Sequence, residues 1–214
     1  MKLLRKLQII SKNSKSKSSK LFVEMFPEKT FLDIDYKTPS EYVMKYWNAY
    51  KDKGYNDKAV NGAFFELIIR TLFIREGLLP MYLQAKVAFI PNVIYDLILY
   101  NKEHGPIAIS LKTSLRERRK QADLEAIALK YVHRKSICYL ISLDSQEVEI
   151  SKKEIQNGEL LGLDNVILAN GKEFDDLIYN LKKKTFTESG SVEVITSNQI
   201  VTSTLITKYG TERK

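Results

Sequence analysis

The stretch that decides how this chain is interpreted is SLKTSLRERRKQADLE, residues 110–125. It contains Lys112 at the end of an apolar run, the triplet Arg116-Glu117-Arg118, and Glu125. Arginine pairs with the O6 and N7 atoms of guanine, and a carboxylate accepts from the N4 amino group of cytosine. A lysine beside carboxylates is what metal-assisted cleavage of a phosphodiester needs. The stretch therefore indicates a segment that both reads a G·C step and cuts beside it.

Helical and strand-like patterns alternate on either side of this stretch. Before it, we expect a helix from Thr38-Pro39-Ser40-Glu41 to Gly54, a helix over about 56–76, and strands over 84–90, 93–100 and 106–112. After it, we expect helices over 115–133, 151–157 and 173–183, and strands over 136–143 and 166–169. The tail, 188–214, is expected to supply strands or a dimer contact. The pattern predicts an α/β fold with a central mixed β-sheet flanked by helices.

Composition narrows the class of partner. The chain of 214 residues has a net charge of +8 and a pI near 9.3, which favours nucleic acid first and an anionic membrane second. No apolar run approaches the length of a membrane span. Residues 1–10 lack the long apolar core of a signal peptide.

The only cysteine, Cys138, lies in an apolar run and is expected to be a buried strand residue, so a Cys/His zinc cluster is excluded. We expect a cytoplasmic protein.

A predicted hairpin brings an acid and a lysine together. Residues 101–105 have turn chemistry, and pairing Tyr100 with Pro106 places Asp96 opposite Ser110 with Lys112 on the same face. Asp96 is the only charged residue between Val87 and Tyr100. A carboxylate in such a strand is costly unless it is paired or binds a metal. An ion pair that only holds the hairpin is the simpler interpretation.

Two further carboxylates are candidates for the same site. Glu125 follows Lys112 by thirteen residues and shares a helix face with Arg118. Glu66 lies inside the earlier helix and is either a third acid or a structural glutamate. Two or three carboxylates bind a hard cation such as Mg²⁺, and the lysine steadies the phosphate. The triplet has a structural alternative, because Ser114 and Glu117 have the spacing of a capping box.

The pattern of Asp96, Ser-x-Lys at 110–112 and then Glu125 resembles the PD-(D/E)XK nucleases in their rearranged form. In that form a downstream helix supplies the carboxylate that the D/E-x-K element lacks. The run Lys-Thr-Ser-x-Arg-Glu-Arg-x-Lys-Gln is similar to type II restriction endonucleases that recognise CC:GG-containing sites. The resemblance covers about residues 66–143. It implies metal ligation by Asp96 and Glu125, catalysis by Lys112, an auxiliary role for Glu66, and base reading by residues 116–118.

The resemblance implies Mg²⁺-dependent cleavage of double-stranded DNA at a G·C-containing site, with 5′-phosphate and 3′-hydroxyl ends. Its partners would be DNA, a second copy in a homodimer, and a DNA methyltransferase with the same target. We expect one nuclease domain over residues 21–214, with a catalytic core at about 56–145. Two other functions stay open, a structure-specific repair or junction nuclease and a non-catalytic DNA-binding module.

Residues 1–20 are expected to form a basic helix or arm followed by a Lys/Ser-rich linker. The sequence over 11–20 has no apolar residue, which favours a mobile linker with contacts to DNA phosphates as a secondary role. The expected contacts to the DNA backbone come from Lys12, Lys15, Lys17, Lys20, Arg119 and Lys120.

Overall fold

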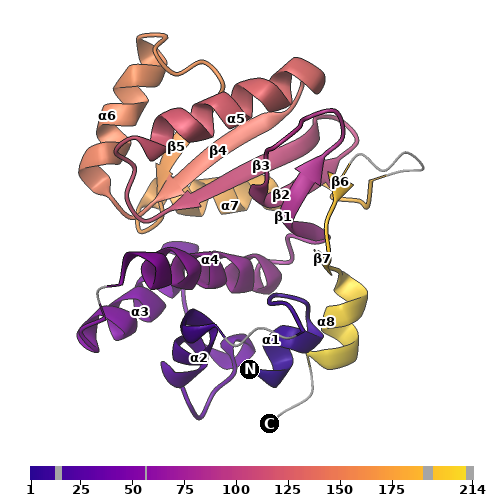
Figure 1. The fold of residues 1–214 in the computed structure, drawn as a ribbon. Coiled ribbons are helices and arrows are strands. Elements are labelled where there is room, and N and C mark those ends of the chain that lie inside the picture. The colour runs from indigo at the N-terminus through magenta and orange to yellow at the C-terminus, as the bar shows by residue number, and fades with distance from the viewer. Residues whose placement is uncertain (13–15, 56, 190–194, 211–214) are drawn as a thin grey trace.

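In the computed structural model, which describes residues 1–12, 16–55, 57–189 and 195–210, a seven-stranded sheet lies between helical layers (Figure 1). The strand order is β5-β4-β3-β2-β1-β6, and β7 also pairs with β1. Neighbours β3–β4 and β4–β5 are parallel, and the other pairs are antiparallel. The expected mixed α/β sheet is therefore confirmed. The strands are β1 Met81–Val87, β2 Tyr95–Asn101, β3 Gly105–Lys112, β4 Ile137–Ser142, β5 Asn165–Leu168, β6 Ile195–Thr196 and β7 Gln199–Val201.

The β2–β3 hairpin has the predicted register. Tyr100 pairs with Pro106 and Leu97 with Ile109. Gly105 adopts a φ of +73°, a left-handed conformation that glycine reaches without steric cost. The Asn101 side-chain oxygen accepts the His104 backbone N–H at 2.8 Å and closes the turn. The turn thus fixes which residues of the two strands lie opposite each other.

Helices cover both faces of the sheet. Helices α5 Arg118–Val132 and α6 Ser145–Gln156 pack on one face, and α4 Lys58–Arg75 and α7 Lys172–Lys182 pack on the other (Figure 1). Helix α4 is apolar around most of its circumference because it lies between the sheet and a further layer of helices. That layer holds α1 Lys2–Lys6, α2 Lys17–Glu24, the short 3-10 helix Phe31–Asp33, α3 Pro39–Asp52 and α8 Ser203–Tyr209. Among the described residues, no helix is both long and apolar enough to cross a membrane.

The Lys/Ser-rich segment differs from the expected linker. Ser16 caps α2 by accepting the Ser19 backbone N–H, and Ser18 and Ser19 are buried. Residues 17–20 are therefore helical because their serines satisfy one another while the helix packs on α4 through Leu21 and Phe22. Lys15 lies outside the described residues. The division of the chain at residue 20 stays a prediction.

Several boundaries also differ from the sequence-based ones. Strand β1 begins at Met81 instead of residue 84, and Gln84 lies within it at a φ of +47°. Helix α6 begins at Ser145 instead of 151, since Asp144 caps it through the Glu147 backbone N–H. Helix α5 begins at Arg118 instead of 115, and its cap residue Glu117 makes no side-chain cap bond, so the Ser114–Glu117 capping box is not formed.

Other expectations are confirmed. The tyrosines of α3 belong to the core, and Gly54 and Gly77 follow α3 and α4 in left-handed conformations. Cys138 is buried in β4, and this burial raises the pKa of its thiol to about 12. The tail supplies β6, β7 and α8. Whether it also makes a dimer contact stays a prediction.

Candidate active site

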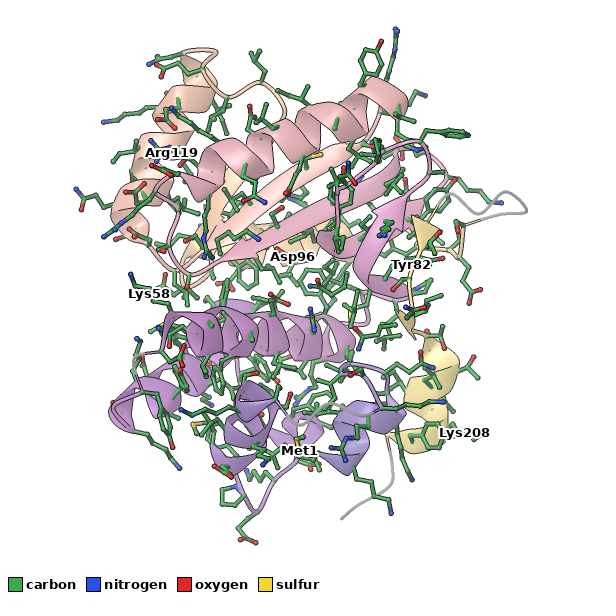
Figure 2. The ribbon with its side chains drawn as sticks, viewed as in Figure 1. Met1, Lys58, Tyr82, Asp96, Arg119 and Lys208 are labelled. Atoms are coloured by element: carbon green, nitrogen blue, oxygen red, sulfur yellow. The ribbon has the colours of Figure 1, made fainter. Side chains whose placement is uncertain are left out.

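Asp96 and Lys112 meet at the end of the hairpin remote from its turn. The Lys112 Nζ lies 2.7 Å from Asp96 Oδ2, which also accepts the Leu111 backbone N–H at 2.8 Å. Both side chains are largely covered, at 18% and 14% exposed. Asp96 lies in the layer between the sheet and α4 (Figure 2). The two residues are thus placed together as the predicted register required.

The strands are irregular where Asp96 lies. In β2, Tyr95 and Ile98 belong to the apolar cluster under α5, whereas Leu97 and Leu99 belong to the cluster against α4. Strict alternation would put Tyr95 and Leu97 on the same face. The alternation therefore breaks at Asp96, and it breaks at Gln84 in the neighbouring strand, where the backbone is left-handed. A break of this kind redirects side chains at the edge of a site.

Glu66 of α4 completes the cluster. Its carboxylate forms an ion pair with Arg70 one turn later and accepts the Gln84 side-chain amide at 3.3 Å. Burial raises the pKa of Glu66; the Arg70 charge opposes this, Asp96 raises the pKa further, and Lys112 lowers it. The Gln84 contact brings Glu66 to the strand that pairs with β2, and the charges of Asp96 and Lys112 both act on its carboxyl group.

The carboxylate pair fits a hard cation. The Asp96 charge raises the pKa of Glu66, and a divalent ion between the two carboxylates would remove that cost. Mg²⁺ is usually held by one or two carboxylates and completes its shell with water and substrate phosphate. Among the described residues, no group of three or more His, Cys, Asp or Glu side chains is gathered closely enough to form a complete metal site. Metal binding at this carboxylate pair therefore stays a prediction.

Glu125 is held by other contacts. Its side chain accepts the Gln121 amide at 2.8 Å, and its backbone carbonyl accepts the Tyr95 hydroxyl at 3.0 Å. No hydrogen bond or ion pair between described residues joins Glu125 to Asp96 or Lys112. The structure thus pairs Asp96 with Lys112, while the catalytic roles of all four residues and metal binding by Asp96 and Glu125 stay predictions.

The triplet at residues 116–118 is exposed where α5 begins. In the described part of the chain, none of its three side chains makes a hydrogen bond or an ion pair. Arg116 has a φ of +31°, a conformation that non-glycine residues seldom adopt. The positive end of the helix dipole lies beside these side chains. Arg116 and Arg118 are therefore free to contact an anionic ligand.

Arg119 and Lys120 behave differently from each other. The Arg119 guanidinium lies 2.6 and 2.9 Å from the two carboxylate oxygens of Glu154 and 3.2 Å from Glu147, and its hydrogen bonds, together with its charge, lower the pKa of Glu154. A contact with DNA phosphate would require it to leave α6, so the expected role of Arg119 has no support from this geometry. Lys120 is exposed, as expected. Both phosphate-binding roles stay predictions.

Two residues of the cluster were not among the sequence-based candidates. Arg70 is almost fully buried and also donates to the Ile9 carbonyl at 3.3 Å. Its position four residues after Glu66 in an apolar helix was a usable signal, because such spacing pairs opposite charges. Gln84 gave no signal, since nothing in a strand pattern marks which residue will reach a neighbouring helix.

The sheet order and the flanking helices match the fold of solved restriction endonucleases. The chain is similar to the solved structure of restriction endonuclease PspGI in a complex with substrate DNA, at 19% identity over 80% of this chain and 83% of that one, with a TM-score of 0.51. It is also similar to metal-depleted Ecl18kI in complex with uncleaved DNA, at 16% identity over 90% of this chain and 88% of that one, with a TM-score of 0.53. Metal-depleted Ecl18kI with uncleaved, modified DNA matches at 16% identity over 88% of each chain, with a TM-score of 0.51.

No protein-family model and no curated protein matches the sequence. The likeness therefore lies in the fold, at identities too low to transfer individual residues. The predicted fold class is confirmed, and the roles of the site residues rest on their own geometry.

Proposed function

We propose that this chain is a type II restriction endonuclease that cleaves double-stranded DNA with Mg²⁺ at a G·C-containing site of the CC:GG type. The observation that carries the proposal is the covered Asp96–Lys112 pair, with Glu66 beside it and an exposed Arg-Glu-Arg triplet four residues further along the chain. The residues proposed to cleave DNA and the residues proposed to read its bases are thus joined by one short segment of the chain. The DNA in the PspGI and Ecl18kI structures supports the same interpretation.

The cutting residues have separate tasks in this proposal. Asp96 and Glu125 hold the metal, and Glu66 supports them as an auxiliary acid. Bound Mg²⁺ would supply charge neutralisation and activation of the attacking water. Lys112 is held in place by Asp96, so its ammonium group is preorganised to stabilise the charge that builds up on the scissile phosphate. Cleavage leaves a 5′-phosphate and a 3′-hydroxyl.

The triplet reads bases in the major groove. Arg116 and Arg118 donate to guanine, and Glu117 accepts from cytosine N4. A helix start aimed into the groove is a frequent geometry for such contacts. The exposed lysines Lys12, Lys17, Lys20 and Lys120 add contacts to phosphates that carry no sequence information. The protein would act as a homodimer, because a two-fold symmetric site suits a two-fold symmetric protein.

One digest tests the proposal. Purified protein is incubated with plasmid DNA and Mg²⁺, and discrete fragments are expected. Structure-dependent nicking would instead indicate a repair or junction nuclease. Intact DNA with retarded mobility would indicate a binding module without catalysis.

A second experiment tests the expected partner, a DNA methyltransferase with the same target. A methyl group on N4 or C5 of the cytosine read by Glu117 would crowd the groove edge where the triplet binds. Cleavage is therefore expected to fail on DNA methylated at that cytosine. Equal digestion of methylated and unmethylated sites, tested at each cytosine of the mapped target, would rule out protection by this route.

A further inference from the structure

The loop between β1 and β2, residues 88–94, lies at the same end of the sheet as the Asp96–Lys112 pair. Strand β1 ends where this loop begins, and β2 resumes one residue before Asp96. The antiparallel register of β2 and β3 puts the start of β2 beside the end of β3, where Lys112 lies. The loop therefore extends from the sheet next to the candidate active site.

Two large apolar side chains of this loop face solvent. The Phe89 side chain is 86% exposed and the Ile94 side chain is 51% exposed. Residues 85–95 contain no acidic residue, and Lys86 is their only charged one. The loop thus presents an apolar tip that does not repel a polyanion.

The backbone of the loop holds the Phe89 ring outward. The Ile90 backbone N–H donates to the Val87 carbonyl at 3.2 Å and closes a turn. Phe89 is the third residue of this turn, at a φ of +65°, a position that usually needs glycine or asparagine. Ile90 is buried in the apolar cluster under α5, and Val93 packs against the same cluster. The loop is therefore anchored beyond the ring, and its costly backbone conformation is of the kind that is retained at functional sites.

The strand order places this loop and the Arg-Glu-Arg triplet on opposite sides of the Asp96–Lys112 pair. Strand β3 leads into the triplet and into α5, which packs over β3 and β4. The loop lies on the other side, where β2 is followed by β1. In a duplex, the phosphate backbone separates the major groove from the minor groove. With the triplet in the major groove and the scissile phosphate at the pair, the loop faces the minor groove.

We propose that Phe89 inserts from the minor groove into a base step of double-stranded DNA beside the cleaved bond, with Ile94 against the groove edge. This inference rests on the proposed function, which supplies the position of the duplex. Apolar side chains used in this way unstack a base step partially and kink the duplex. Stacking of a ring on a base tolerates any sequence, because every base has a π-face. The contact is therefore expected on a duplex of arbitrary sequence and without metal.

The test places a tryptophan at the loop tip and another at a matched control position. Phe89→Trp is compared with Tyr131→Trp, because the Tyr131 side chain is also 86% exposed. Tyr131 lies in the last turn of α5, which runs back to the start of β4 at the opposite end of the sheet. A short duplex of arbitrary sequence is added to the metal-free proteins, and the parent supplies the signal of Trp47. The duplex should quench the emission of Phe89→Trp about twofold or more and shield it from acrylamide, while Tyr131→Trp stays unchanged.

A second variant separates contact with DNA from support of the fold. Phe89→Gly removes the ring and fits the left-handed backbone. Its affinity for the duplex should fall about fivefold or more, the scale of one lost base stack. Its free energy of unfolding should stay equal or rise, whereas a structural role for the ring would lower it. Tyr131→Ala should bind the duplex within twofold of the parent.

The outcomes separate this proposal from the nuclease proposal. A duplex that binds, as followed by its anisotropy, without quenching Phe89→Trp would overturn the insertion alone, as would equal quenching at the control position. Shielding from acrylamide without quenching would also overturn it, because the ring would then be covered but not stacked. Failure of the parent to bind any duplex would overturn both proposals. Quenching at position 89 by a parent chain that cuts no plasmid DNA would support the insertion and contradict the nuclease.

Discussion

Arg118 and Arg119 are neighbours in the chain but lie in opposite environments. Arg119 is clamped between Glu154 and Glu147 and joins α5 to α6, whereas Arg118 is exposed and its side chain has no partner among the described residues. The first arginine belongs to the scaffold, and the second is available to a ligand. Charged residues at the start of α5 therefore have two different roles: some stabilise the contact between helices, and others face outward. Each substitution below tests one of these two roles.

The largest effect is expected at Lys112, which is paired like Arg119 but belongs to the site. Lys112→Ala should lower the rate of DNA cleavage by about 100-fold or more, the scale of removing one preorganised charge-stabilising group. Specific binding should stay nearly intact, because the lysine acts on a phosphate. The rates are measured on plasmid substrate, with Lys152→Ala as the control because Lys152 is also ion-paired but lies on α6. Cleavage near the parental rate would show that the pair only holds the hairpin.

Substitutions of the three carboxylates should differ in how much they lower DNA cleavage. Asp96→Asn and Glu125→Gln should both abolish cleavage, because each removes a metal ligand. Glu66→Gln should lower it less, since Glu66 is proposed to support the site. The Mg²⁺ concentration that gives half-maximal cleavage is measured for all three. Full activity of Glu125→Gln together with loss in Glu66→Gln would move the second metal ligand from α5 to α4.

Smaller and opposite effects are expected for the arginines. Arg116→Ala and Arg118→Ala should each weaken specific DNA binding by roughly 1–3 kcal/mol, the scale of one good bidentate base contact, and leave unfolding unchanged. Arg119→Ala should instead lower the free energy of unfolding by about 1–3 kcal/mol, because it removes charge-assisted hydrogen bonds to Glu154. Binding titrations and denaturant melts on the same three proteins separate the two effects. Equal losses of affinity for cognate and random DNA would show that the triplet contacts phosphates and does not read bases.

The smallest effect concerns Cys138, which lies under α5 in β4. Burial raises the pKa of its thiol to about 12, so at pH 8 the group is almost wholly protonated and unreactive. Alkylation at pH 8 should therefore proceed only through opening of the structure. The rate should rise in Arg119→Ala, where α5 is less firmly held, and stay unchanged in Arg118→Ala. Fast alkylation of the parent protein would contradict the burial.

Local chemistry predicted the hairpin and most helices correctly. The register of β2 and β3 follows from a three-residue turn over 102–104 and from Gly105, which adopts positive φ, and this register helps to bring Asp96 to Lys112. The boundaries that failed depend on tertiary contacts. The first residues of β1 were missed because the alternation of buried and exposed residues breaks at Gln84. Helix α2 was missed because its sequence is polar and its serines hydrogen-bond to one another.

The candidate site was only partly accessible to the same reasoning. Glu66 and Asp96 come from elements whose packing angle no local pattern specifies, so their proximity appears only when α4 is placed on the sheet. Glu125 was expected beside Lys112 because of its spacing in the sequence. Spacing along a helix determines which face of the helix a side chain lies on, but it does not determine how far that side chain lies from a residue in the sheet. The exposure of the triplet depends on where α5 begins, and Arg116, just before that start, has an unusual backbone conformation.

The pairing of the first and last helices has a consequence for synthesis. Helix α1 packs beside α8, Lys6 lies over the Tyr209 ring, and Gln199 donates to the Gln8 carbonyl. The residues of α1 are therefore made well before those of α8, with a delay of about 10–40 s at the usual rate of translation. During that time Leu4 and Leu7 lack their final covering, and the outer edge of β1 has neither β6 nor β7. An uncovered strand edge invites pairing with other chains, so the nascent protein is most prone to aggregate before β6 and β7 have been made.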